Sequence, residues 1–329
     1  MLKKISLCLA LVAIIVTAIS FRNNLSPNRA NALRTIIIDP GHGGSDGGAN
    51  GSFSKEKDIC LAVSLKLGDL LKKELPNTKI LFTRTTDIYP DLHSRANFAN
   101  ESRGDLFVSI HVNSAPAKKG RELTGYKTST YWKNKKKYTR KVPQYRYYTI
   151  PNPAKGTETY IWGSHKNDEK EVALRENAPM LMEENYQAKY GDIDPNSQDF
   201  IVMASLKTKQ FFKRSATLAL HVEEEFRKVG RASRDIKQRA VGIWVLQATA
   251  MPSILVETGY ISNKEEEEYL NSEPGQQEIA QCIATAIKRY KVELESSQVG
   301  GVETGSPISN EPPSPYSPSV SKEGTLPKK

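Results

Sequence analysis

The chain has 329 residues and a formal net charge of +10, and 38% of its residues are hydrophobic and 26% charged. A chain of this length can bury a sizeable core. Its hydrophobic and charged shares are ordinary for a globular protein, which excludes a multi-span membrane protein and a wholly disordered chain. Its three cysteines include no Cys-x-x-Cys pair, so neither a disulfide-stapled scaffold nor a zinc ribbon is expected.

Residues 1–20 have the pattern of a secretory signal peptide. Lys3 and Lys4 precede an uncharged apolar run, and the small residues Ala18 and Ser20 follow at the spacing of a cleavage site. The run is close to the shortest length that spans a membrane, so an uncleaved anchor is the alternative. Either interpretation predicts an exported protein of the periplasm, cell envelope or extracellular space, in contact with a membrane only if the segment is retained.

A single folded domain is expected over residues 34–292. Residues 21–33 are typical of a linker, and 293–329 of a disordered Ser/Pro-rich tail. Between them, the predicted strands are 34–39, 79–83, 105–111, 157–162, 241–246 and 253–257, and the predicted helices are 56–75, 212–229 and 279–290. Continuous apolar strands separated by amphipathic helices predict an α/β fold, with a mostly parallel twisted sheet flanked by helices.

Two insertions interrupt this alternation. In the first, about 117–155, residues 118–148 hold eleven Lys and Arg, one acid and seven interleaved aromatic residues, so their net charge equals that of the whole chain. This segment could contact an anionic envelope surface, a cell-wall glycan or a protein regulator, or it could be an exposed hairpin whose charges keep it soluble. Because the chain is expected to be exported, no nucleic-acid partner is expected. The second insertion, about 180–205, is a surface loop or a gating segment.

Three polar side chains lie where such a sheet binds ligands, beyond the carboxyl ends of its strands. His42 follows the first predicted strand in a Gly-rich turn, His111 ends the third, and Glu257 ends the last. Glu56 opens the helix after the first loop and could meet the two histidines. Two imidazoles and one carboxylate are a catalytic zinc ligand set that leaves one position open for water. The spacing alone is not specific, because a histidine after a strand is more often a loop or hydrogen-bonded core residue.

Five ordered motifs carry a resemblance to a known family. They are DPGHGGSDGGA, KEKDICLA, RANFAN, DLFVSIHVNSAP and MPSILVETGYISN. In this order, over about 34–290 apart from the insertions, they resemble the zinc-dependent N-acetylmuramoyl-L-alanine amidases, the amidase-3 type of cell-wall hydrolase. The resemblance implies one Zn²⁺ per chain bound by His42, Glu56 and His111, with Glu257 as the catalytic residue. All four residues are present, which favours an active enzyme.

The resemblance implies peptidoglycan as the substrate, during cell-wall remodelling or daughter-cell separation. The bond cut would be the amide between the lactyl group of N-acetylmuramic acid and L-Ala of the stem peptide. Zinc lowers the pKa of a bound water toward about 7 and polarises the carbonyl. Glu257 can take the water's proton and pass it to the leaving amine. Asp39, Arg95 and Asn113 also fall in the family-like segments, and we expect them to support the fold or the ligands.

Two other functions stay open beside this one. A non-catalytic peptidoglycan-binding or scaffold protein could keep the same fold, and another zinc peptidase could act on cell-wall peptides. A serine hydrolase and a zincin-type protease are not expected, because the sequence has neither a Gly-x-Ser-x-Gly elbow nor a His-Glu-x-x-His motif.

The family also suggests a role for the second insertion. Some of its cell-division amidases carry, at a comparable place, a helix that blocks the zinc until an activator protein binds. The segment 183–203 could therefore gate the site, with one of its carboxylates reaching the metal. These carboxylates are Glu183, Glu184, Asp192, Asp194 and Asp199.

The remaining candidates have plainer interpretations. His165 lies in a loop that could approach the site, whereas His221 is expected to be a satisfied helix residue. The run Glu265–Glu268 is expected to be the start of a capped helix, where acidic residues suit the helix dipole. Cys60 and Cys282 lie on predicted helices, and both are expected to be buried.

Overall fold

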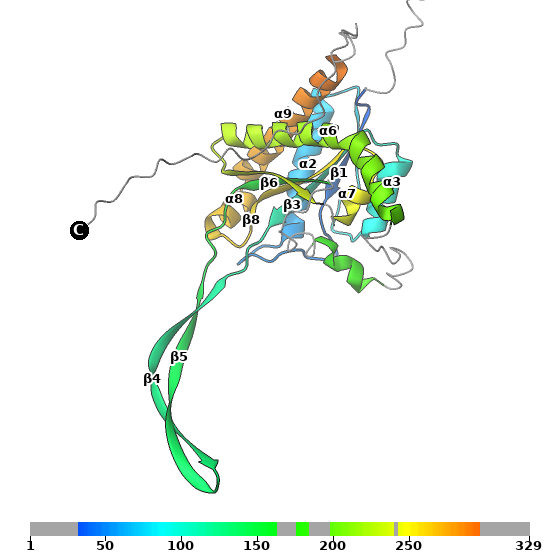
Figure 1. The fold of residues 1–329 in the computed structure, drawn as a ribbon. Helices are drawn as coiled ribbons and strands as arrows, with labels where there is room; N and C mark the ends of the chain where they lie inside the picture. The colour runs from blue at the N-terminus through cyan, green and yellow to red at the C-terminus, as the bar shows by residue number, and fades with distance from the viewer. Residues whose placement is uncertain (1–31, 163–175, 184–197, 240–242, 297–329) are drawn as a thin grey trace, which may run out of the picture.

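The computed structural model describes residues 32–162, 176–183, 198–239 and 243–296 (Figure 1). The expected signal segment, most of the linker and the tail lie outside these ranges, so their predicted properties are not tested. Among the described residues, no helix has the length and apolar character needed to cross a membrane.

A six-stranded sheet forms the centre of the molecule (Figure 1). In spatial order its strands are β2 (Lys79–Phe82), β1 (Thr35–Pro40), β3 (Leu106–Asn113), β8 (Ser253–Tyr260), β6 (Thr157–Trp162) and β7 (Ser233–Arg239). All neighbouring strands run parallel except β6 and β8, which are antiparallel. The predicted mostly parallel α/β sheet is therefore confirmed.

Helices cover both faces of the sheet. They are α2 (Glu56–Glu74), α3 (Leu92–Glu101), α6 (Gln198–Lys228), α7 (Trp244–Ala248), α8 (Lys264–Asn271) and α9 (Glu273–Ser296), with a 3-10 turn η2 (Ala178–Met182). Side chains of α2, α6 and α9 share the larger core with one face of the sheet, and α3 and α7 pack on the other face.

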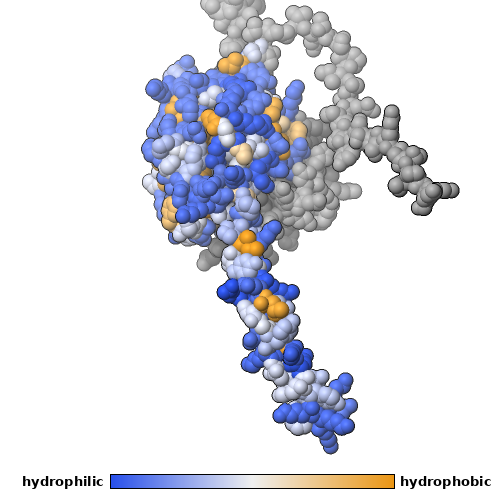
Figure 2. Space-filling view, turned by 90° about the vertical axis from the view of Figure 1, so that its left-hand side faces the viewer, coloured by the Kyte–Doolittle hydropathy of each residue, from blue (hydrophilic) through white to orange (hydrophobic). Residues whose placement is uncertain are grey.

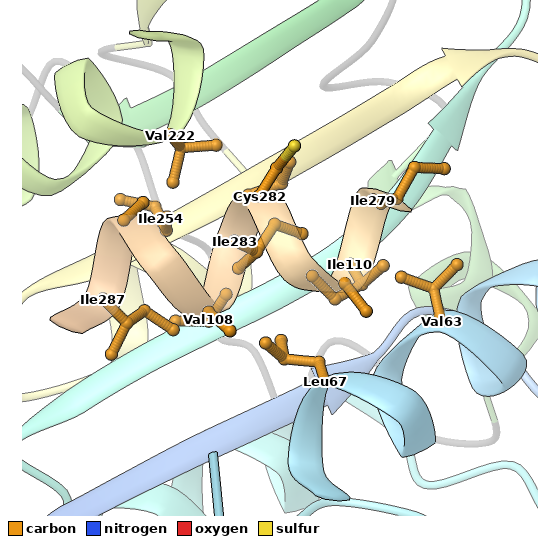
Figure 3. Close-up of a cluster of buried hydrophobic side chains, with 14 of the residues drawn as sticks. Val63, Leu67, Val108, Ile110, Val222, Ile254, Ile279, Cys282, Ile283 and Ile287 are labelled. Carbon is orange, nitrogen blue, oxygen red and sulfur yellow. The ribbon is translucent and has the colours of Figure 1, made fainter. Parts of the chain in front are cut away.

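The central strands are buried on both faces, which explains their continuous apolar runs. Every residue of β3 is buried, and alternate residues serve the two cores: Val108 and Ile110 face α9, whereas Phe107 faces α7. Figure 3 shows Ile283 and Ile287 of α9 beside this strand. Burying one such side chain contributes about 1.5–3 kcal/mol, so this layer fixes where the strand ends lie.

One predicted strand is wrong. The segment 241–246 reads as a strand, but its described part enters helix α7, and residues 240–242 lie outside the described ranges. The missing strand is β7, with the sequence SRDIKQR. It lies at the edge of the sheet, where one side is not covered by another strand and polar side chains are tolerated. An edge strand of this kind has no apolar run to reveal it.

The domain boundaries are slightly wider than expected. Leu33, placed in the predicted linker, is 1% exposed and belongs to the larger core. At the other end, α9 continues to Ser296. The predicted capped helix start is confirmed, because the Asn263 side chain accepts hydrogen bonds from the backbone N–H groups of Glu265 and Glu266. Cys60 and Cys282 are free and buried, as expected.

The first insertion forms an antiparallel hairpin of β4 (Lys118–Lys133) and β5 (Lys136–Ile150), so the hairpin shape named as one alternative is present. Its turn places Asn134 and Lys135 at φ values of 51° and 58°, which is the geometry of a two-residue hairpin turn. Figure 1 shows the hairpin projecting far from the domain. It leaves the domain just after β3, at the carboxyl edge of the sheet.

Candidate metal centre

The loop between β1 and α2 carries the first candidate ligand, and it needs glycine at two positions. A Cβ at Gly41 would lie 2.5 Å from the imidazole of His111. At Gly48, which has a φ of 65°, a Cβ would lie 2.7 Å from both Glu56 Oε2 and the His42 ring. Only glycine lets the loop approach these side chains so closely.

Four side chains that can bind a metal meet at this edge of the sheet: His42, Glu56, His111 and Glu176. Nε2 of His42 lies 3.1 Å from Oε1 of Glu56 and 3.4 Å from Oε2 of Glu176. Nδ1 of His111 lies 3.1 Å and 2.7 Å from the same two oxygens. Ligands placed tetrahedrally at zinc distances are about 3.3 Å apart. The four atoms therefore fit around one small cation.

The hydrogen bonds around the centre orient its ligands. Nδ1 of His42 lies 2.7 Å from Asp46 Oδ2, so its Nε2 turns toward the centre. That nitrogen has no aligned hydrogen bond, although two carboxylate oxygens are near it. Glu56 is held by the backbone N–H groups of Ala49 and Val112, at 2.8 Å and 2.9 Å. A histidine fixed by a carboxylate through its other nitrogen is the usual arrangement of a metal ligand.

The charges of the centre favour a bound cation. Burial alone would raise the pKa of Glu56, but the charge of His42 holds it well below its usual range. Burial would lower the pKa of His111, but Glu176 raises it to about 9. Two buried carboxylates thus keep protons on the imidazoles in the absence of a metal. A divalent cation would replace those protons and be stabilised by the same carboxylates.

Glu257 lies beside the four-residue centre without belonging to it. It is the register partner of His111 across the parallel strands β3 and β8, and it is 0% exposed. Register partners in a parallel sheet point to the same face, so the side chain of Glu257 lies on the same face of the sheet as the His111 imidazole, one strand away. A small cavity borders His42, His111 and Glu176, and Tyr89, Pro179 and Ile243 contribute to its lining.

Arg95, Asp39 and Asn113 support the strand ends and the loop. Arg95 Nη1 donates to Asp39 Oδ1 at 2.7 Å, and its Nη2 donates to the backbone oxygen of His42 at 2.6 Å. Burial alone would raise the pKa of Asp39, but Arg95 and neighbouring hydroxyls lower it. Asn113 Nδ2 donates to the buried Glu158 at 3.1 Å. The three residues therefore lie where hydrogen bonds and an ion pair can hold the ligand-bearing segments.

Glu267 of α8 supports the other end of the same loop. Its two carboxylate oxygens accept hydrogen bonds from the backbone N–H groups of Ser52, Phe53 and Ser54, and from both serine hydroxyls. Burial would raise the pKa of Glu267, but these hydrogen bonds lower it to about 2. The loop is thereby fixed immediately before Glu56.

Sequence reasoning did not find Glu176 or Asp46, and it placed Glu267 only in the start of a helix. Asp46 could have been noticed four residues after His42, but Glu176 follows no strand and belongs to no periodic segment. The carboxylate that reaches the centre thus comes from just before the predicted gating segment. Within that segment, Glu183 accepts a hydrogen bond from Tyr89 and is not one of the four residues.

Only some of the other gating candidates and histidines fall within the described residues. Glu184, Asp192, Asp194 and His165 fall outside the described residues, and Asp199 lies in α6. His93 contacts the ring of Trp244, with ring centroids 5.7 Å apart. His221 Nε2 lies 2.9 Å from Glu293, consistent with the expected satisfied helix histidine.

Comparisons with known proteins agree with the motifs. The family model described as N-acetylmuramoyl-L-alanine amidase matches residues 36–289. The N-acetylmuramoyl-L-alanine amidase AmiC of Escherichia coli O6:H1 is 32% identical over 267 residues, covering 80% of this chain and 55% of AmiC. AmiA of Escherichia coli K12 is 28% identical over 267 residues, covering 80% and 78%. The chain thus spans about half the length of AmiC.

Among solved structures, an N-acetylmuramoyl-L-alanine amidase from Clostridium difficile 630 has a similar fold. It is 25% identical, with a TM-score of 0.50 over 79% of this chain and 97% of that chain.

Proposed function

The chain belongs to the N-acetylmuramoyl-L-alanine amidase family, and from this premise we propose that it is an exported zinc-dependent amidase acting on peptidoglycan. It hydrolyses the amide between the lactyl group of N-acetylmuramic acid and L-Ala of the stem peptide. The convergence of His42, Glu56 and His111 on one point, with Glu257 beside it, is the observation that carries this proposal.

Each residue of the centre has a chemical task in this reaction. His42, Glu56 and His111 hold the metal, and two imidazoles with carboxylate oxygen suit zinc among the available divalent ions. Zinc bound there supplies Lewis-acid polarisation of the scissile carbonyl and makes water acidic near neutral pH. Glu257 accepts a proton from the attacking water and delivers it to the leaving nitrogen as the C–N bond breaks. The products are a free carboxylate on the lactyl group and a free amine on L-Ala.

Product analysis tests this function. Peptidoglycan digested by the full chain should yield stem peptides with a free L-Ala amine, as identified by mass analysis. A chelator should abolish this product, and added zinc should restore it, because the hydrolysis depends on the metal. Cleavage elsewhere in the stem peptide would instead support another zinc peptidase. Binding to the wall without any new amine would support a non-catalytic scaffold.

We further infer that Glu176 keeps the centre closed until an activator protein binds. Its carboxylate occupies the position of a fourth ligand, which substrate or water would otherwise take. The segment around it is tied down at two points. The side-chain oxygen of Asn177 accepts a hydrogen bond from the backbone N–H of Trp244 at 3.0 Å, and Glu183 accepts one from Tyr89. A partner that broke these contacts would withdraw the carboxylate and open the site.

Removal of the Glu176 carboxylate should therefore activate the enzyme. We expect Glu176→Ala to raise hydrolysis of dye-labelled peptidoglycan about 10–100-fold without an activator, because the open state no longer competes with the closed one. The exposed Glu101 of α3 provides a control, and Glu101→Ala should leave the rate as it is. A fall in both zinc content and activity of Glu176→Ala would show that this residue is a permanent ligand.

A further inference from the structure

The hairpin of β4 and β5 carries the charge of the whole protein. Residues 118–148 have a net charge of +10, so the net charge of the rest of the chain is zero. The single acidic residue, Glu122, is paired with Arg146 at 2.6 Å. The remaining cations face solvent along the hairpin, which at strand spacing is about 50 Å long. Figure 2 shows it as a narrow arm of mostly hydrophilic surface with a few apolar patches.

Five of the seven aromatic residues of the hairpin fall into two groups. Tyr131 and Tyr138 are cross-strand partners that stack with ring centroids 5.7 Å apart, so they stabilise the hairpin itself. By contrast, Trp132, Tyr147 and Tyr126 are 71%, 68% and 62% exposed. A single exposed ring needs no explanation, whereas exposed rings gathered on one face of an arm point to an interaction site.

These three exposed rings share one face of the ribbon. Tyr126 is paired with Pro143 and Trp132 with Lys137, and paired residues share a face of the ribbon. Because β5 is regular, Lys137, Pro143 and Tyr147 point to the same face, and the three rings lie on it together. An irregularity in β4 between Leu123 and Gly125 places Arg121, the partner of Tyr147, and Lys119 on this face as well. The same face carries lysines and an arginine, namely Lys119, Arg121, Lys137 and Lys141.

The face forms a stripe of rings and cations that winds about the arm. Two-stranded ribbons twist strongly, and Figure 1 shows β4 and β5 coiling around each other. The rings extend over about 33 Å of strand, which is more than one sugar unit can contact. A flat lipid surface would meet only a part of such a stripe, whereas a flexible chain can follow it. Rings suit the faces of sugars, and cations suit carboxylates.

We propose that the hairpin binds a strand of peptidoglycan outside the cleavage site and so holds the enzyme on its polymer. The inference rests on the proposed amidase function, which supplies the identity of the polymer: amino sugars bearing carboxylate-rich stem peptides. The base of the hairpin supports this role. The backbone N–H of Ala115 donates to Ser262, and Asn263 donates to the backbone oxygen of Ala154. These contacts anchor the arm beside the end of β8, at the same edge as Glu257.

The test is cosedimentation of the full chain with purified insoluble peptidoglycan that has been stripped of other attached polymers. All proteins carry Glu257→Gln, so that the wall stays intact during the assay. A ring variant combines Tyr126→Ser, Trp132→Ser and Tyr147→Ser. We expect its Kd for the wall to rise about 10–100-fold, as the loss of three ring contacts implies.

A charge variant combines Lys119→Gln, Lys137→Gln and Lys141→Gln, and it should bind more weakly with a smaller dependence on salt. The matched control replaces three exposed lysines of the domain by glutamine, and its binding should equal that of the parent. These lysines are Lys73, Lys79 and Lys264. One zinc ion per chain in every variant shows that the domain is folded.

Equal binding by the ring variant and its parent would overturn the proposal. So would tighter binding of the hairpin-intact chain to phosphatidylglycerol vesicles or to double-stranded DNA than to the wall, since the arm would then recognise anionic charge alone. The assay does not require hydrolysis. Failure of the amidase proposal appears in the product analysis, whereas failure of the hairpin proposal appears only here.

Discussion

Glutamine in place of Glu257 should lower the rate of peptidoglycan hydrolysis by about 10²–10⁴, the usual contribution of a general acid–base residue. Glutamine has nearly the same shape but cannot accept a proton at neutral pH. Glu257 lies outside the group His42, Glu56, His111 and Glu176, so zinc should remain bound. Because Glu257 is 0% exposed, bulk water cannot easily reach its position and act as the base in its place.

The measurements are turnover of labelled peptidoglycan and zinc content of the purified variant. Glu101→Gln, which changes an exposed carboxylate of α3, is the control and should keep both values. Loss of zinc together with activity in Glu257→Gln would make Glu257 a ligand and not a proton carrier. Full activity with zinc bound would require another base, and the proposed mechanism would be wrong.

The strands that carry the centre were predictable because burial leaves a clear signal. β1, β3 and β8 lie inside the sheet, so their sequences are continuous apolar runs, and the polar residues at their ends stand out. The ends of parallel strands share one edge, which is why His111 and Glu257 could be expected together. Glu56 could be expected near them as the first residue of the following helix.

The edge strand, the start of α7 and the position of Glu176 could not be predicted, because they depend on tertiary packing that no local sequence pattern reveals. The strand β7 is a polar edge strand, and the apolar run before α7 reads equally well as strand or helix. Glu176 reaches the centre through contacts of its neighbour Asn177 with Trp244, far along the chain. The family resemblance suggested that a carboxylate from an inserted segment blocks the site, but it did not identify this one.

Methionine in place of Arg95 should lower the free energy of unfolding by about 3–5 kcal/mol, because it leaves the carboxylate of Asp39 buried without its cation. Arg95 is 2% exposed and Asp39 1%. Urea unfolding at neutral pH measures the loss. The control is Arg289→Met, since Arg289 pairs with Glu224 and Glu225 but its side chain is 37% exposed. Both side chains of its pair with Glu224 are exposed, and Glu225 keeps Lys228 as a second partner, so this loss should be only about 0–1 kcal/mol.

The loss should depend on pH with a defined sign. In the parent, the pKa of Asp39 is lowered, so its contribution is present at neutral pH and is lost as pH falls through that pKa. In Arg95→Met burial would raise the pKa, and the penalty should grow as pH rises above the unfolded value of about 3.9. The difference between the two proteins should therefore shrink in acid. A difference independent of pH would place the effect of Arg95 in packing alone.

The same substitution should also weaken the metal centre, because Arg95 donates to the backbone oxygen of His42. Loss of such a supporting contact typically lowers metal affinity about 10–100-fold. Zinc titration of the folded variant against a competing chelator measures this separately from stability. Should zinc affinity stay unchanged while stability falls, the loop must be positioned by Arg84, which donates to the backbone oxygens of Pro40 and Gly41. In that case Arg95 would support the sheet edge and not the metal.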